Sequence, residues 1–476
     1  MNQADTAASP ASAAPGASRV LAEFAAQLRF TDIPADVIHR MKTSMLDSIG
    51  CCLHGMTLPW TQRVRDLVLD EGAAPAASIW GTGKKSSVAG AVLVNATAGH
   101  AFELDDIHKE SVVHPGSIAV PVVIALAEQL RAHEGKQLLT AMVAGYEVGT
   151  RVGNAATTAL FFQGFHPQGT SGVFVAAAAA GKMMGLDAQR MLHALGIAGS
   201  QAGGLMAAQE GAMVKRFHSG RAAQSGVYSA QLAAKGFTGI EDVLEAEYGG
   251  YLSSYSTAPK VAKLTEGLGA VWESGKVGYK PYACVTSIHA ALQGIDHLMK
   301  TQGLRAADIA SVRIGVSKMT HTHCAWEYKA QGVTAAQMNL YYGVAVMALE
   351  RSAFVEQYAY EKLDAPQVFD FISRIEAYVD PELERMGPAF RHAARIAIRT
   401  GDGRQFQHEA LNRRGSPEDP MSADEVEYKF RQIVASVLSP EDAGKVVSLV
   451  ARIDEEEHCS DLVDIIQASR APGATL

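Results

Sequence analysis

The chain lacks the cysteine pattern of a disulfide-stabilised or metal-binding protein. Its five cysteines are odd in number, and no two of them have the C-x-x-C spacing of zinc and redox motifs. Cys51 and Cys52 are adjacent, which does not suggest a disulfide framework, and no run of three or four thiols offers ligands for an iron–sulfur cluster. We therefore predict core thiols in a reducing compartment, the cytoplasm.

Long apolar runs are also missing, because no stretch reaches the ~18 apolar residues that a membrane span needs. The first 18 residues, rich in Ala, Ser and Pro, lack the charged start and apolar core of a signal peptide, so we expect a disordered tail over 1–18. The phosphate-binding glycine motifs and the G-x-S-x-G motif of serine hydrolases do not occur either.

An excess of positive charge is absent too. Lys and Arg number 42 against 50 Asp and Glu, which gives a formal net charge of -8. This balance argues against nucleic acid and membrane surfaces as main partners, although a locally basic pocket can still bind a small anion. What the chain does have is apolar residues, 48% of its 476, enough for the cores of about two domains.

The pattern of apolar residues predicts a mainly α fold. Ala-rich amphipathic helices joined by Gly-containing turns continue to about Gly269, and we expect an all-helical domain over 19–275. Then SVRIGV and RIEAYV alternate like strands, RIAIRT-GDGR-QFQHEA is typical of a hairpin, and TAAQMNLYYGVAVMALE is helical. These features predict a smaller α+β domain over 276–404, and the helical segment 405–476 is expected to complete the first domain.

The first cluster of polar residues is HAFELDDIHKESVVHPGS, in which acids and histidines precede an apolar helix. A carboxylate such as Glu103 or Asp105 can orient an imidazole or raise its pKa for proton transfer near neutral pH. His114 falls just before the helix, whose N-terminus favours a substrate carboxylate. The alternative is a solvated charged loop.

A second and a third cluster follow in the helical half. In FFQGFHPQGTSG, His166 lies in a turn where Gly169 permits close approach to a ligand, although a single such histidine is often structural. In QEGAMVKRFHSGRAAQSG, Lys215 and Arg221 belong to a basic group inside a small-residue stretch. Such cations are rarely buried unless paired, so they bind either an anionic ligand or the Asp105 region.

The fourth cluster, VGYKPYACVTSIHAALQG, falls at the predicted domain boundary, where ligand pockets are common. Lys280 and Tyr282 flank a proline, and His289 follows on a helix; a surface loop is the alternative. HTHC at 321–324 is the nearest approach to a metal motif, but no second spaced pair of ligands accompanies it, so we predict that no metal binds.

Taken together, these segments resemble the MmgE/PrpD family, which contains 2-methylcitrate dehydratase, cis-aconitate decarboxylase and iminodisuccinate epimerase. The resemblance runs from Leu21 through the motifs above to GSPEDPMSADEVEYKF. It implies a helical domain, an α+β lid, a homodimer and no metal or organic cofactor. The chain departs from the family pattern at Ile107 and at Met338-Asn339.

The resemblance also implies a set of site residues in this chain. Those expected to act in catalysis are Glu103, Asp105, His114, His166, Lys215 and His289. Those expected to bind substrate are Gly169, Arg221, Lys280, Tyr282 and Tyr342.

All three family activities move a proton at a carbon beside a carboxylate, so cationic donors lower the cost of the charge that develops there. We assign this role to Lys215 and Lys280, with Arg221 possible, and proton transfer to His114 and His166. His289 or Tyr342 could protonate a leaving hydroxyl. We therefore predict a lyase, first a hydro-lyase like 2-methylcitrate dehydratase, then an epimerase-like isomerase, then a decarboxylase. A non-catalytic carboxylate-binding dimer is the alternative of a different class.

Overall fold

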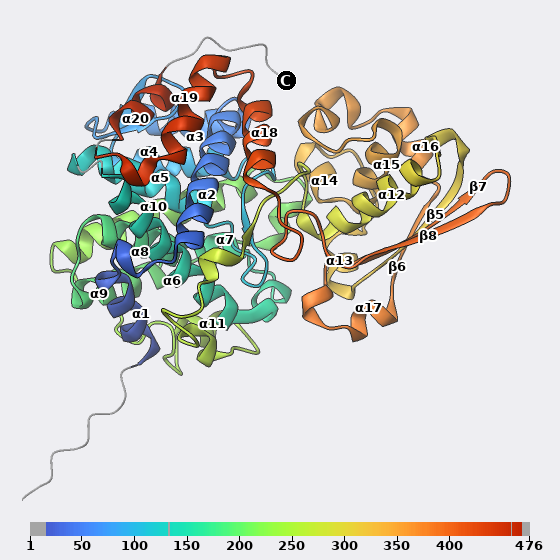
Figure 1. Cartoon of the computed structure of the whole chain (residues 1–476). Helices are drawn as coiled ribbons and strands as arrows, with labels where there is room; N and C mark the ends of the chain where they lie inside the picture. The colour runs from blue at the N-terminus through green and yellow to red at the C-terminus, as the bar shows by residue number, and fades with distance from the viewer. Residues whose placement is uncertain (1–15, 132–133, 458, 469–476) are drawn as a thin grey trace, which may run out of the picture.

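The computed structural model describes residues 16–131, 134–457 and 459–468. Figure 1 shows a larger helical lobe that contains both the first and the last helices, and a smaller lobe that contains the longer strands. The fold is mainly α with a smaller α+β part, so the predicted fold class is confirmed. The expected tail over 1–18 falls almost wholly outside the described residues.

Helices from the first half of the chain build most of the larger lobe, and three C-terminal helices complete it (Figure 1). The first-half helices are α1 (Ala17–Gln27), α2 (Ala35–Gly55), α3 (Pro59–Asp70), α4 (Val88–Gly99), α5 (Gly116–Leu130), α6 (Gly135–Phe162), α7 (Pro167–Thr170), α8 (Gly172–Met183), α9 (Ala188–Gly199), α10 (Val214–Ala234) and α11 (Tyr251–Tyr255). The C-terminal helices are α18 (Ala423–Val434), α19 (Pro440–Ala451) and α20 (Ser460–Gln467), and α18 and α19 both pack on α2.

The centre of this lobe consists of small residues on closely packed helices. α8 carries a run of five alanines, which favour the helix and leave room for its neighbours α6 and α10. At the crossing of α10 and α4, a Cβ on Gly220 would lie 2.1 Å from Thr97 Oγ1. A side chain at Gly220 would therefore force the two helices apart, and would displace the loop that follows α4 and the loop that precedes α10.

A four-stranded sheet and six helices form the smaller lobe. The strands, in the order β6-β5-β7-β8, are β6 (Ile375–Val379), β5 (Ile309–Val316), β7 (Ala394–Thr400) and β8 (Gln405–Ala410). β5 is parallel to β6, with Val312 opposite Ile375, and antiparallel to β7, with Ile314 opposite Ile396. The helices are α12 (His289–Thr301), α13 (Lys318–Cys324), α14 (Val333–Met338), α15 (Leu340–Glu350), α16 (Pro366–Ile372) and α17 (Pro381–Arg385).

The structure corrects two details of the prediction. β8 hydrogen-bonds to β7, so the sheet continues to Ala410, whereas the expected domain boundary at 404 would cut the hairpin. The helical stretch over 334–350 is divided at Asn339, whose side chain accepts a hydrogen bond from the Tyr342 backbone at 3.0 Å and caps α15. The tendency of asparagine to cap helices explains this break.

Two further short sheets consist of two antiparallel strands each. β1 (Ala77–Ile79) pairs with β2 (Lys84–Ser86), and β3 (Ile107–His108) pairs with β4 (Val277–Gly278). All five cysteines are buried and free, as predicted for core thiols. Within the described ranges, we find no helix that combines the length and the apolar character needed to cross a bilayer.

Candidate active site

The acidic segment between α4 and α5 is a buried loop. Glu103, Asp105 and Asp106 are at most 2% exposed, which excludes the solvated charged loop considered above. Glu103 adopts φ +55, a conformation that is uncommon for residues other than glycine. The sequence therefore buries three carboxylates in one short segment, and each needs partners to offset the loss of water.

Distant parts of the chain hold this loop in place. Lys429 of α18 donates hydrogen bonds to the Leu104 carbonyl, between Glu103 and Asp105, and to Asp47 Oδ1 of α2 at 2.7 Å. The β3–β4 pair joins Ile107–His108 to Val277–Gly278, just before the KPY motif. The C-terminal segment and the domain boundary thus both position the acidic loop.

Glu103 is the centre of a buried group of three cations. Lys215 donates a hydrogen bond to Glu103 Oε1, Arg216 Nη1 binds the same oxygen at 2.6 Å, and Lys280 Nζ binds Oε2 at 3.0 Å. Burial disfavours the Glu103 carboxylate, but the three cations outweigh this effect and hold its pKa well below the usual range. The basic group of α10 therefore pairs mainly with Glu103, not with Asp105 and Asp106.

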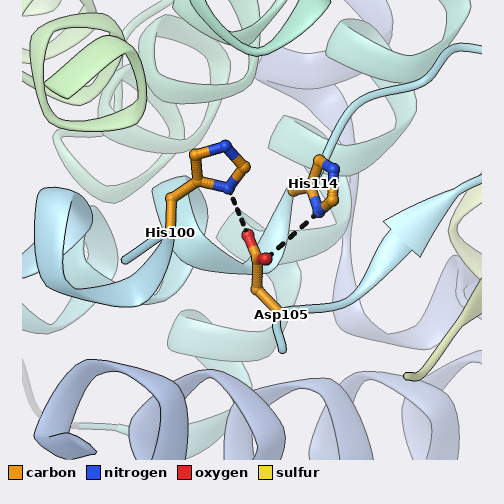
Figure 2. Close-up of side chains that lie close together, drawn as sticks. All are labelled: His100, Asp105 and His114. Carbon is orange, nitrogen blue, oxygen red and sulfur yellow. Dashed lines mark hydrogen bonds and ion pairs between the residues drawn. The ribbon is translucent and has the colours of Figure 1, made fainter. Parts of the chain in front are cut away.

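Asp105 lies between two imidazoles (Figure 2). Its Oδ2 is 2.8 Å from His100 Nδ1, and its Oδ1 is 3.3 Å from His114 Nδ1. Burial lowers the pKa of His100 to about 3 despite the nearby carboxylate, so His100 is neutral near pH 7 and donates its Nδ1 proton to Asp105. Although burial opposes it, the two histidines hold the pKa of Asp105 well below its usual range. Asp105 is thus an anion that lies beside the His114 ring and orients it.

A second imidazole pair adjoins this triad. His166 and His218 share a hydrogen bond between their Nδ1 atoms at 2.9 Å, and the His166 ring centroid is 5.7 Å from that of His100. Burial and the Lys215 charge hold the pKa of His166 well below its usual range. Burial also lowers the pKa of Lys215 to about 8, although Glu103 opposes this shift. A neutral imidazole and a cation that titrates near neutral pH therefore lie in one site.

Gln168 of α7 fixes the backbone at His114. Its Oε1 accepts from the His114 backbone N–H at 2.8 Å, and its Nε2 donates to the His114 carbonyl at 3.0 Å. The same Nε2 lies 3.0 Å from the hydroxyls of Ser117 and Ser219. This one side chain ties the turns of His114 and His166 to α5 and α10.

His100, Asp105 and His114 are the one group in the described parts of the chain whose ligand atoms lie close enough to hold a metal ion, within 4.8 Å of one another. Asp105 Oδ2 already accepts a hydrogen bond from His100 Nδ1, and Lys280 Nζ lies 3.8 Å from Asp105 Oδ1. A positive charge so near disfavours a second cation. The donor set therefore fits a hydrogen-bonded triad better than a metal centre.

A narrow cavity of about 40 Å³ brings the clustered residues together between the lobes. Its larger-lobe wall includes Glu103, His114, His166, Lys215 and Lys280. The lining residues also include Ile107, Lys109, His323, Met338 and His392. Two positions where the chain departs from the family pattern, Ile107 and Met338, thus face the space that a substrate would occupy.

Other predicted site residues lie elsewhere in the described structure. Arg221 is exposed and bonds Gln224 on its own helix. Tyr342 donates its hydroxyl to the Gln357 carbonyl at 2.6 Å in the core of the smaller lobe. His289 is buried against the ring of Tyr282, which lines a separate groove of about 1210 Å³.

Gly169 has a structural role in the site. It packs so closely that a Cβ would lie 2.1 Å from the Gly203 carbonyl oxygen. This contact concerns the backbone and does not by itself indicate binding of a ligand.

Several residues of the site were not selected from the sequence. In the sequence, His100 resembles an ordinary residue at the end of an Ala-rich helix. Arg216 and His218 belong to the basic group, but nothing in the sequence marked them as more important than its other members. Their signal was present, because a histidine or arginine in a stretch of small buried residues needs a partner. Lys429 gave a weaker signal, since it follows an ordinary amphipathic pattern on α18.

Comparison with known proteins now identifies the family. The MmgE/PrpD N-terminal domain matches residues 19–262, and the MmgE/PrpD C-terminal domain matches residues 282–455. The chain belongs to the MmgE/PrpD family. The cavity lies where the two matched domains adjoin, and Lys280 falls in the short segment between them.

Curated relatives within the family are similar over nearly the whole chain. Cis-aconitate decarboxylase of Aspergillus terreus is 30% identical, with 95% of this chain and 96% of the relative covered. A cis-aconitate decarboxylase-like protein of Aspergillus oryzae is also 30% identical, with 94% and 96% covered. Human cis-aconitate decarboxylase is 27% identical, with 92% and 91% covered.

Proposed function

We propose that this member of the MmgE/PrpD family is a lyase that acts on a small polycarboxylate, and that it decarboxylates an unsaturated tricarboxylate such as cis-aconitate. The observation that carries the proposal is the convergence of two imidazoles, His114 and His166, and two ammonium groups, Lys215 and Lys280, on one cavity. The names of the relatives favour decarboxylation over the dehydration that we ranked first from the sequence.

The charges of the site suit such a substrate. Three cations surround Glu103, and with the Asp105 carboxylate beside Lys280 the group keeps a net charge of about +1. Lys215 and Lys280 face the cavity and can bind a substrate carboxylate in a site from which water is largely excluded. The cavity of about 40 Å³ is smaller than a tricarboxylate, so we expect the smaller lobe to open for entry.

The chemistry needs one proton and a stabilised anion. The departing carboxylate is attached to the carbon next to a carbon–carbon double bond. When it leaves as CO2, the electrons of the broken bond form a new double bond, and those of the original double bond move to a carbon that carries a second carboxylate. That carbon then takes up a proton. Lys215 and Lys280 would stabilise the charge at that second carboxylate. His114, oriented by Asp105, would donate the proton.

Dehydration remains the second candidate because His114 and His166 both line the cavity and could serve as base and acid. The other acids considered for a leaving hydroxyl, His289 and Tyr342, lie away from it. An epimerase or a non-catalytic binding protein would use the same cations. The homodimer, the cytoplasmic location and the absence of metal stay predictions.

Incubation with a panel of di- and tricarboxylates tests the proposal. We expect proton NMR to show conversion of an unsaturated tricarboxylate, with CO2 released in equal amount. Water loss from a hydroxylated tricarboxylate without CO2 would favour the dehydratase instead. Binding without turnover of any polycarboxylate would leave the non-catalytic alternative.

A further inference from the structure

Arg413 is a buried cation whose guanidinium has no hydrogen-bond partner among the described residues. It lies in the loop that connects β8 to α18 and is 2% exposed. Its Nε, Nη1 and Nη2 atoms make no hydrogen bond to any part of the chain that the structure describes. Since buried guanidinium groups are almost always paired, an acceptor from outside the described chain is expected here.

The groups around Arg413 add positive charge and offer it little compensation. Arg391 donates to the Pro388 carbonyl at 3.2 Å and to the Lys109 carbonyl, both of them neutral acceptors. Glu418 is the acid whose charge opposes the lowering of the Arg413 pKa by burial, but the Glu418 carboxylate already forms an ion pair with Lys109 Nζ at 2.9 Å. His392 adjoins this cationic group as a neutral imidazole, because burial and the nearby Arg391 hold its pKa well below the usual range, and its Nδ1 has no partner among the described residues. An anion would satisfy the whole group at once.

The cationic group is continuous with the candidate active site. His392 and Lys109 both line the cavity that contains Lys215 and Lys280. The loop of Arg413 also runs beside the segment of Lys280, because the Tyr279 backbone N–H donates to the Gly415 carbonyl at 2.9 Å. Arg413 itself does not line this cavity, so a ligand carboxylate would reach it past Lys109 and His392.

We propose that Arg413, with Lys109 and His392 beside it, binds the substrate carboxylate that is remote from the carbon receiving the proton. The planar guanidinium group offers two parallel N–H donors, which match a carboxylate. This proposal rests on the proposed function, and it makes the protein selective for substrates with three carboxylates over those with two. Arg413 would close on its ligand as the lobes come together.

The test compares Arg413→Met with Arg399→Met, an exposed arginine on β7, in the full chain. The probes are tricarballylate, a saturated tricarboxylate, and inorganic phosphate, each added in a thermal shift assay. Without ligand, Arg413→Met should keep or raise the Tm, since an unpaired buried charge is lost. Its Kd for tricarballylate should rise at least about tenfold, as should the KM for the tricarboxylate substrate, with a smaller change in kcat. Arg399→Met should match the wild type.

Several results would overturn the proposal. One is an Arg413→Met protein with an unchanged KM while the wild type turns over a tricarboxylate; this result leaves the proposed function standing. Another is loss of the phosphate shift alone, which would assign Arg413 to a free anion. If Arg413→Met does not fold, Arg413→Lys serves instead, and unaltered tricarboxylate affinity there contradicts the need for a planar donor. Failure of the wild type to turn over any polycarboxylate overturns the proposed function itself.

Discussion

Buried charged side chains on the two sides of the cavity differ in whether they have partners within the chain. In the larger-lobe wall, the Glu103 and Asp105 carboxylates each have cationic or imidazole partners from the same chain. Behind Lys109 and His392 of the opposite wall, in the loop that connects β8 to α18, Arg413 is equally buried but lacks an acceptor among the described residues. The carboxylates of the first wall are thus paired without a ligand, whereas Arg413 would be paired only by an added anion.

This difference indicates which part of the site is rigid. A buried ion-pair group with several hydrogen bonds holds His114 and Lys215 in position before substrate arrives, as preorganised catalysis requires. A wall with an unpaired cation is less stable when closed and empty, so it is the natural part to open.

The largest effect should come from acid, which protonates the buried histidines His100 and His323 in the unfolded chain but leaves them neutral in the folded protein. Burial lowers the pKa of His100 to about 3 and that of His323 to about 4, so below pH 6.5 the unfolded chain binds more protons than the folded one. Stability is therefore full above pH 6.5 and falls as pH decreases, by about 1.4 kcal/mol per pH unit for each such histidine. Chemical denaturation at pH 7.5, 6.5 and 5.5 measures it. His323→Gln should reduce the slope by one histidine's share, and a flat profile would contradict the prediction.

Glu103→Gln should break the paired wall. It leaves Lys215, Arg216 and Lys280 buried around a neutral amide, and breaking such a group costs about 3–5 kcal/mol of stability. Thermal denaturation and urea titration give the change, with exposed Glu110→Gln in the same loop as the control. Equal stability of the two variants would mean that the cations find other partners.

His114→Gln should remove the proton donor but keep the wall intact. The expected loss is about 10²–10⁴-fold in kcat, typical of general acid–base catalysis, with a smaller change in substrate affinity. Steady-state kinetics on the identified substrate, with exposed His39→Gln as the matched control, measures it. A near-normal kcat would restrict His114 to shaping the turn before α5.

Lys215 should impose an alkaline limit on the reaction. With a pKa of about 8, it loses its charge as pH rises through that value, and kcat/KM should then fall up to about tenfold per pH unit. Lys215→Arg keeps a charge at every accessible pH, so this decline should disappear even if the rate is lower throughout. Persistence of the same decline in the arginine variant would assign it to another group.

The smallest effect is expected for Arg221→Met. This arginine is exposed and bonds Gln224, so its removal should change stability by less than about 0.5 kcal/mol. We expect kcat/KM to stay within about twofold of the wild type. A large rise in KM would show that Arg221 reaches the substrate in a conformation other than this one.

The sequence predicted those site residues that can be recognised from their immediate neighbours in the chain. His114 and His166 were recognisable because each falls in a turn just before an apolar helix, and Lys215 because a lysine is unusual among small buried residues. The strands and most helices were equally clear from their spacing. These features need no knowledge of the rest of the chain.

The partners were not predictable in the same way. Pairing of the basic group with Glu103 depends on the crossing of α10 with α4, and Lys429 acts on Leu104 across 325 residues of sequence. Arg413 is one arginine in a polar loop, and only its burial without an acceptor distinguishes it. Charge in a local segment reveals that a partner is needed, but only the packing of distant elements reveals which partner it is.

The most direct test of the proposed chemistry is to follow cis-aconitate with the wild-type protein in heavy water, by NMR and by measurement of CO2. We predict one CO2 for each molecule consumed and one deuteron at the product carbon beside a carboxylate, the position that His114 would protonate. Consumption without CO2, or product without deuterium at that carbon, would contradict the account.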